Sequence, residues 1–293
     1  MFKFNDTAYA TISSHKRDKI QTLRINNKHC DAEIAMFGAH LLSFSPKSDG
    51  IERIWLSELA CFDKSKAIRG GVPICWPWFA DLYPKSAQSN ITNFPAHGFV
   101  RDQDWHIVDI QENENATTLI LSPNELGLFQ YPSLFSVMLQ VTFAQQCTIT
   151  LISKNDSKHT VDFTAALHTY FTVSNIKQTE IKGVEGSFID KTQSGKNLQL
   201  SLPYLVMAET DRIHSQDNTN NFKHITIVAA TTTTIVQSGH DSVVIWNPWK
   251  EKSRIMSDIQ NEGYQSMLCV EASVTEGISL APEAEHQLIQ IIG

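Results

Sequence analysis

The sequence predicts an all-β sandwich or barrel with few short helices. Many short segments alternate polar and apolar residues with a period of two, or are rich in β-branched residues, and both patterns favour strands. Turn-forming clusters such as 48–50, 154–156 and 193–195 separate these segments. Helical patterns are restricted to short stretches at 251–259 and 122–128.

The expected strands run along most of the chain. In order they are 20–25, 31–36, 117–121, 135–143, 147–153, 161–171, 225–228, 231–236, 243–245, 267–274 and 286–292. In the segment 161–171, His168 and Tyr170 lie on a polar face opposite an apolar one. No linker, charge block or shift in composition divides the chain, so we expect residues 1–293 to form a single domain.

The composition restricts the kind of protein. With 293 residues, 42% of them hydrophobic, the chain can bury a large core, and its net charge of −7 argues against a nucleic-acid partner. Five scattered cysteines without a C-x-x-C pair suit reduced thiols. Because the sequence has no signal-peptide pattern and no apolar run of about 20 residues, we expect a cytoplasmic protein with no membrane partner. No interface signature is visible, and a monomer is expected.

Motifs for the common cofactors are absent. The sequence lacks the phosphate-binding pattern G-x-x-x-x-G-K-[ST], the dinucleotide pattern G-x-G-x-x-G and the zinc pattern H-E-x-x-H. It also lacks the G-x-S-x-G nucleophile elbow, and its eleven histidines show no clear metal-ligand spacing. We therefore expect chemistry by ordinary side chains, with no cofactor and no metal ion.

The segment 69–79 has the most unusual composition. It combines two glycines, two prolines and three large aromatic residues behind Arg69. Glycine permits close backbone approach, and proline makes the backbone rigid. This combination predicts a rigid pocket wall with apolar faces and one positive charge, which suits a sugar ring that carries an anionic group.

His168 and Glu271 are the candidates for proton transfer. A histidine titrates near neutrality and can both donate and accept a proton. Glu271 interrupts the apolar strand 267–274, and an unpaired buried charge is costly, so its carboxylate should point into a cavity or polar layer. The alternatives are a histidine bonded within a polar sheet face and a glutamate on a solvated one.

Other polar and aromatic residues could bind a substrate. Arg69 and Arg101 are candidate anion clamps, because guanidinium groups bind phosphate bidentately, although each could form a structural ion pair instead. Asp211 could accept hydrogen bonds from sugar hydroxyls or cap a turn. His97 could line the pocket or satisfy a loop carbonyl. Trp246, like the tryptophans at 76, 78 and 249, could stack on a pyranose or pack around a proline.

Taken together, these segments resemble the glucose-6-phosphate 1-epimerase family, the hexose-6-phosphate mutarotases of the aldose-1-epimerase-like superfamily. The matching segments occur in the family's order at 65–73, 76–79, 97–101, 167–171, 209–213, 244–249 and 269–271. Two features depart from the family pattern: Ala80 stands where glycine is expected, and Ala272-Ser273 follow Glu271 where proline or asparagine is common. These departures affect loop details and substrate preference rather than reactive groups.

The resemblance implies a galactose-mutarotase-like β-sandwich with a concave active face. It implies that His168 is the general acid and Glu271 the general base in the interconversion of hexose 6-phosphate anomers. It places Arg69 and Arg101 at the 6-phosphate and Asp211 on sugar hydroxyls. From their own positions in the sequence, we also expect His97 and Trp246 to contact the substrate. At ordinary pKa values, Glu271 would be ionised, and His168 would be half-protonated at about pH 6.5.

Three alternative functions remain open at this stage. The chain could be an aldose 1-epimerase for unphosphorylated sugars, a non-catalytic carbohydrate-binding sandwich, or a structural or regulatory protein that keeps the same fold.

Overall fold

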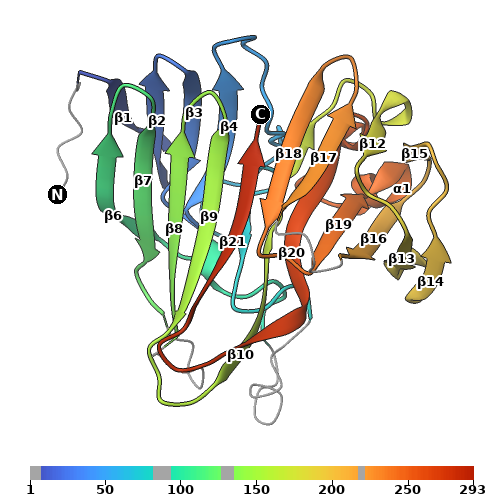
Figure 1. Cartoon of the computed structure of the whole chain (residues 1–293). Helices are drawn as coiled ribbons and strands as arrows, with labels where there is room; N and C mark the ends of the chain where they lie inside the picture. Colours follow the sequence, from blue (N-terminus) through green and yellow to red (C-terminus); the bar gives the residue numbers. More distant parts are fainter. Residues whose placement is uncertain (1–7, 82–93, 127–134, 217–221) are drawn as a thin grey trace.

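The computed structural model describes residues 8–81, 94–126, 135–216 and 222–293, and antiparallel strands dominate it (Figure 1). In these residues, 21 strands form three sheets, which confirms the predicted all-β class. The first sheet contains, in order, β1 (Ala10–Arg17), β2 (Ile20–Asn27), β3 (Cys30–Ala35) and β4 (His40–Pro46).

The largest sheet has nine strands. Their order is β15 (Tyr204–Leu205), β12 (Glu180–Lys182), β17 (Lys223–Val228), β18 (Thr232–Ser238), β21 (Glu285–Ile292), β9 (Cys147–Asn155), β8 (Phe135–Phe143), β7 (Thr117–Pro123) and β6 (Trp105–Glu112). The four-stranded sheet lies behind β6 to β9 in Figure 1. The side chain of Asn27 connects the two sheets, because its Nδ2 donates to Phe143 O at 3.1 Å.

The third sheet has eight strands and lies toward the other end of the molecule (Figure 1). Its order is β14 (Lys196–Gln199), β13 (Ser187–Asp190), β16 (Thr210–Ser215), β19 (Ser242–Asn247), β20 (Met267–Leu280), β10 (Val161–Leu167) and β5 (Ile74–Cys75), and β11 (Tyr170–Thr172) also pairs with β20. Residues 267–274 of β20 are buried on both faces. One face contributes Leu268, Val270, Ala272 and Val274 to the hydrophobic core, and the other carries Glu271.

The helices are short. They are α1 (Trp249–Ile255) and the 3₁₀ turns η1 (Val100–Asp102), η2 (Ile176–Gln178), η3 (Lys191–Gln193) and η4 (Gly263–Gln265). The helix predicted at 251–259 starts two residues earlier, where the Trp249 N–H donates to Asn247 Oδ1. The helical prediction at 122–128 is wrong for residues 122–126, because the first two end β7 and the next three are not helical. Residues 127 and 128 lie outside the described residues. No helix in the described ranges is long and apolar enough to cross a bilayer.

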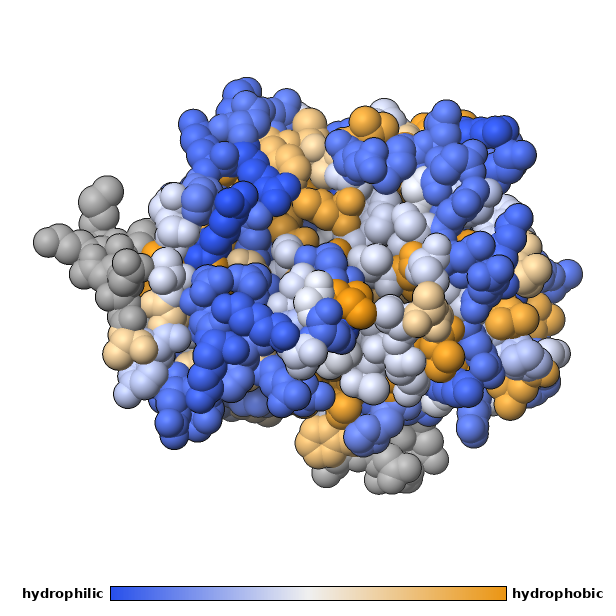
Figure 2. All heavy atoms as spheres, turned by 90° about the horizontal axis from the view of Figure 1, so that it is seen from above, coloured by the Kyte–Doolittle hydropathy of each residue, from blue (hydrophilic) through white to orange (hydrophobic). Residues whose placement is uncertain are grey.

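One continuous cluster of buried apolar side chains extends from Ala10 to Ile292. Strand β8 illustrates its origin, because its alternate residues from Phe135 to Phe143 are buried apolar side chains. On the surface seen from above, hydrophilic residues predominate and apolar residues show only in scattered groups (Figure 2). The period-two alternation of polar and apolar residues in the sequence therefore predicts correctly which side chains of such strands face the interior.

The segment 69–79 contributes mainly to this core rather than to a pocket wall. Trp76 and Trp78 are fully buried among core residues. Gly71 has a φ of +68°, and a Cβ there would lie 2.4 Å from His40 Nε2. The glycine is thus required by close approach to His40. The prediction of a rigid segment fits this packing, but Trp76 and Trp78 pack in the core instead of lining a pocket.

Candidate active site

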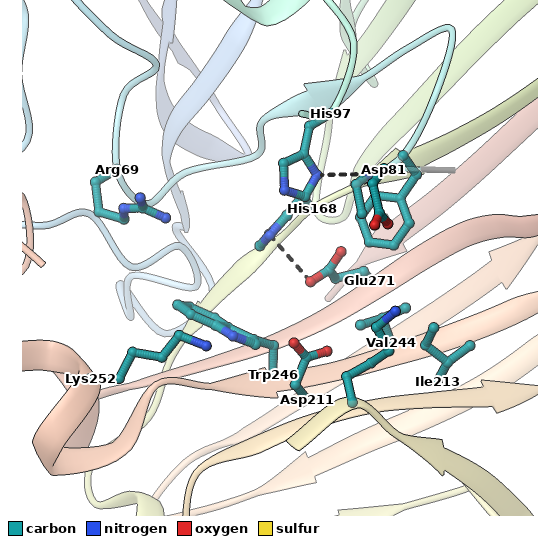
Figure 3. A pocket seen from close by; sticks show the side chains of 13 residues that line it. Arg69, Asp81, His97, His168, Asp211, Ile213, Val244, Trp246, Lys252 and Glu271 are labelled. Atoms are coloured by element: carbon teal, nitrogen blue, oxygen red, sulfur yellow. Dashed lines mark hydrogen bonds and ion pairs between the residues drawn. The ribbon is translucent and has the colours of Figure 1, made fainter. Parts of the chain in front are cut away.

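A cavity of about 270 Å³ opens on the eight-stranded sheet (Figure 3). Its lining is a mixture of acidic, basic, histidine and apolar side chains. These are Arg69, Phe79, Ala80, Asp81, His97, His168, Lys191, Asp211, Ile213, Val244, Trp246, Lys252 and Glu271. Six of the seven residues predicted from the sequence to form the site therefore line one cavity, and Arg101 does not.

Strand register explains how distant segments meet there. Glu271 on β20 pairs with Val244 on β19, which pairs with Ile213 on β16. Directly paired residues in antiparallel strands project from the same face of a sheet. The row two residues along is formed by Cys269, Trp246 and Asp211. Apart from Cys269, which does not line the cavity, the residues of these two rows form its floor.

His168 reaches this floor because its strand is interrupted. The predicted strand 161–171 is divided into β10 and β11, with His168 and Thr169 between them. In this gap the His168 N–H donates to Pro73 O at 3.1 Å. The imidazole stacks on the Tyr170 ring with a centroid separation of 5.0 Å and an interplanar angle of 11°. The gap therefore fixes both the backbone and the ring plane of His168.

The imidazole and the Glu271 carboxyl group face each other across the cavity floor (Figure 3). His168 Nδ1 lies 3.3 Å from Glu271 Oε1. Both Glu271 oxygens and His168 Nδ1 are buried without a hydrogen-bond partner among the residues described. The geometry brings a potential acid and base together but leaves their polar atoms available to a ligand.

Burial shifts both groups toward their neutral forms. It raises the pKa of Glu271 well above its usual range, and the nearby Asp211 raises it further. It lowers the pKa of His168 well below its usual range, and His97 and Arg69 add to this effect. Both shifts run against the expectation of an ionised glutamate and a half-protonated histidine. The reason is desolvation, which sequence spacing does not reveal.

Arg69 is held at the cavity by two other side chains. Its Nη1 donates to the Tyr170 hydroxyl at 2.9 Å, and its Nε lies 3.2 Å from Asp258 Oδ1. Tyr170 thus contacts both Arg69 and His168. Neither Tyr170 nor Asp258 was expected from the sequence to take part in the site. The alternation that places Tyr170 on the same face as His168 is the signal that could have identified Tyr170.

Arg101 lies near the cavity without lining it. Its Nη2 donates to Ala96 O at 3.0 Å. Its positive charge still contributes to the lowered pKa values of His97 and His168. The cavity is lined by two cations that were not expected from the sequence, Lys191 and Lys252. Lys252 follows the matching segment 244–249 by three residues, which is the signal that could have identified it.

His97 is a neutral hydrogen-bonding group in this environment. Its ring Nδ1 accepts from the Ala80 N–H at 3.3 Å. Burial is the main cause that lowers its pKa to about 3, followed by the charges of Arg101 and Arg69. With Nδ1 as acceptor, the proton of the neutral ring resides on Nε2, which is then a donor.

Asp211 and Trp246 lie side by side in the second row of the floor. Burial raises the pKa of Asp211, and the nearby Lys252 and Lys191 oppose that shift. The Trp246 ring lies edge-on to His168, with centroids 6.1 Å apart. Of the tryptophans considered for stacking, Trp246 lines the cavity, whereas Trp249 packs on Tyr264 at 5.3 Å.

Two residues of the cavity lining and the buried Cys269 next to them form a set of donor atoms that could hold a metal ion. One ligand atom each from His168, Cys269 and Glu271 lies within 4.8 Å of the other two.

Comparison with known proteins agrees with this architecture. Residues 21–293 match the family described as aldose 1-epimerase. A relative in Escherichia coli (strain K12) is 32% identical over 288 residues, which cover 96% of this chain and 92% of the relative. One in Salmonella typhimurium (strain LT2) is 31% identical over 263 residues, covering 89% and 85%. Both carry the provisional name glucose-6-phosphate 1-epimerase.

A solved structure is also similar. The crystal structure of a protein from Salmonella typhimurium, described provisionally as a mutarotase, superimposes with a TM-score of 0.84 at 29% identity. The match covers 96% of this chain and 92% of that one. The mutarotase-like β-sandwich and the isomerase class implied by the resemblance are confirmed. The chain belongs to the aldose 1-epimerase family.

Proposed function

We propose that this protein interconverts the α and β anomers of hexose 6-phosphates. The observation that carries the proposal is the buried pair of His168 and Glu271, 3.3 Å apart, in a cavity that Arg69, Lys191 and Lys252 also line. The pair can transfer protons to and from a hemiacetal, and the cations suit a phosphate group. The names of the Escherichia coli and Salmonella typhimurium relatives support the same substrate.

Ring opening requires one proton to leave the sugar and another to reach it. The Glu271 carboxylate accepts the proton of the C1 hydroxyl while the His168 imidazolium donates one to the ring oxygen O5. The C1–O5 bond breaks, and C1 becomes an aldehyde carbon. Rotation about C1–C2 then presents the other face of the carbonyl. The protein holds acid and base on adjacent segments, which supplies orientation.

The neutral forms that burial favours correspond to the state after ring opening. Protonated Glu271 can donate to the carbonyl oxygen, and neutral His168 can accept the proton of the C5 hydroxyl, which closes the ring. The neutral pair and the ion pair hold the same single proton. Binding of the polar sugar needs only to move that proton from Glu271 to His168. One site can therefore catalyse both directions.

Substrate binding is assigned to the cavity lining. Arg69, Lys191 and Lys252 are proposed to attract the phosphate, and Asp211 and neutral His97 to bond sugar hydroxyls. Trp246 offers an apolar edge beside the ring. Arg101 as a direct phosphate contact stays a prediction, because its guanidinium is bonded to Ala96 O and does not line the cavity.

Anomer exchange of glucose 6-phosphate, measured by NMR saturation transfer, tests the proposal. The protein should accelerate exchange, and His168→Ala should abolish the acceleration. Unaltered exchange with the wild-type protein would contradict it and favour a non-catalytic sugar-binding role. Equal acceleration of glucose and glucose 6-phosphate would instead favour an aldose 1-epimerase for unphosphorylated sugars.

The phosphate contacts can be tested by the same measurement. Arg69→Ala should raise the KM for glucose 6-phosphate by at least about tenfold, since hydrogen bonds to charged groups contribute about 1.5–3 kcal/mol. It should affect glucose much less. Arg101→Ala is the matched variant. An increase in KM as large as that of Arg69→Ala would establish a direct contact between Arg101 and the phosphate. A small increase in KM would indicate that Arg101 acts through its charge.

We also propose that the protein acts as a monomer in the cytoplasm, with residues 1–293 as one domain. The five free cysteines support a reducing compartment. The continuous core from Ala10 to Ile292 supports a single folding unit. Light scattering of the purified protein and a single calorimetric unfolding transition would test the monomer and the single domain.

A further inference from the structure

Cys269 is the buried neighbour of the proton-transfer pair, and the proposed reaction does not use it. It lies two residues before Glu271 on the same face of β20 and is fully buried. It pairs with Tyr170, whose ring stacks on His168. Strand register therefore places a sulfur beneath both the imidazole and the carboxyl group.

The three side chains form a compact set of donors. One nitrogen, one sulfur and one oxygen atom lie within 4.8 Å of one another. Two ligands at about 2.0–2.1 Å from a tetrahedral zinc ion are roughly 3.3 Å apart. The 3.3 Å between His168 Nδ1 and Glu271 Oε1 matches that separation.

The donors also lack other partners. Both carboxyl oxygens of Glu271 and Nδ1 of His168 are buried without a hydrogen bond in the described part of the chain. Unsatisfied buried polar atoms are costly and commonly indicate an unseen ligand. Substrate hydroxyls would satisfy them in the reaction, and so would a cation.

The donor types select the metal. Mixed sulfur, nitrogen and oxygen ligands favour Zn²⁺ and similar thiophilic ions, whereas Mg²⁺ and Ca²⁺ prefer oxygen ligands alone. Binding would release the thiol proton and the carboxyl proton. The thiolate and carboxylate would then carry two negative charges, which neutralise a divalent cation. A neutral complex suits a buried position.

We propose that His168, Cys269 and Glu271 form a binding site for a thiophilic divalent cation, which inhibits the enzyme by occupying its acid and base together. The metal site itself does not depend on the proposed sugar chemistry, whereas the inhibitory effect of the metal does.

Metal binding can be measured without any activity assay. Titration of the protein with Cd²⁺ should produce a thiolate-to-metal charge-transfer band. The measurement should use a Cys61→Ser background, because Cys61 is partly exposed beside Asp63 and could bind the ion at the surface. Cys269→Ala in that background should lose the band. The matched control is Cys75→Ala, which removes another fully buried thiol near His97 and should keep it.

Inhibition is tested by anomer exchange with Zn²⁺, each variant being normalised to its own activity without metal. Zn²⁺ should inhibit competitively with glucose 6-phosphate, a chelator should reverse the effect, and Mg²⁺ should have none. Cys269→Ala should raise the inhibitory Zn²⁺ concentration by at least about tenfold, since even indirect contacts of a metal site contribute that much.

Two outcomes would overturn the proposal. The first is a charge-transfer band that persists in Cys269→Ala, and the second is Zn²⁺ inhibition equal in Cys269→Ala and Cys75→Ala. Absence of anomer exchange in the metal-free protein would contradict the proposed function alone, because the Cd²⁺ band would still report on the site.

Discussion

Strands β8 and β9 differ sharply from the segment around His168. In the first region, nine residue pairs follow one another without a register shift, and the inward residues are apolar. In the second, β10 has a register shift between Phe163 and Ala165 and ends at Leu167, one residue before His168. The regular region buries apolar surface, and the interrupted region directs polar groups inward. The comparison indicates that this sandwich obtains stability and chemistry from different parts of its sheets.

The burial of Glu271 makes this difference clear. A buried carboxyl group without a hydrogen bond is unfavourable for folding, and the surrounding core must compensate for it. We therefore expect substitutions in the two regions to separate activity from stability.

The largest expected effect is that of Glu271→Gln on catalysis. The amide keeps the size of the side chain but cannot take up the C1 hydroxyl proton, so kcat for anomer exchange should fall by about 10²–10⁴-fold. Thermal unfolding should change little, because burial already favours the uncharged carboxyl group. A variant that keeps wild-type kcat would remove Glu271 from the mechanism.

The second prediction concerns the regular region. Leu139 on β8 is fully buried in the core. Leu139→Ala should lower the free energy of unfolding by about 2–5 kcal/mol through lost contacts and a cavity. The kcat of the folded protein should be nearly unchanged. Met138→Ala, one residue earlier and exposed, is the control and should have little effect on denaturant unfolding. Equal losses in both variants would contradict the assigned packing of β8.

The third prediction is a pH dependence of stability. His40 is buried beneath the segment 69–79, and burial lowers its pKa from 6.5 to about 4. Between these values the unfolded chain binds more protons than the folded one, so acidification favours unfolding. Stability should therefore fall from about pH 7 to about pH 5, with about 1–2 kcal/mol of the loss due to His40. His40 Nε2 lies 2.7 Å from Gly70 O. His40→Gln, whose amide N–H can donate to the same oxygen, should have a smaller pH dependence of stability in urea unfolding, and an unchanged pH dependence would refute this account.

The smallest effect is expected for Tyr170→Phe. This change removes the hydroxyl that accepts from Arg69 and keeps the ring that stacks on His168. The KM for glucose 6-phosphate should rise by about fivefold, equivalent to about 1 kcal/mol, while kcat changes less. Tyr170→Leu removes the stacked ring as well and should also lower kcat. If both variants lowered kcat equally with unchanged KM, the link from Tyr170 to Arg69 would have no role in binding.

Much of this protein could be predicted from the order of its residues. Alternation identified strands such as β8 and β9, because a side-chain period of two is a local property of the chain. The same alternation placed His168 on the polar face of its strand, and Glu271 was evident as a charged residue within an apolar strand. Their types alone indicated proton transfer, since few side chains can transfer protons near neutral pH.

The tertiary structure decided how these residues are used. It moved Trp76 and Trp78 into the core, left Arg101 outside the cavity lining and brought Lys191 and Lys252 to it. It also buried His168 and Glu271, which lowers the pKa of the imidazole and raises that of the carboxyl group. A pKa depends on burial and on neighbouring charges, and a cavity depends on register across several strands. Both are set by residues far apart in the chain, so they become defined only when β16, β19 and β20 pair.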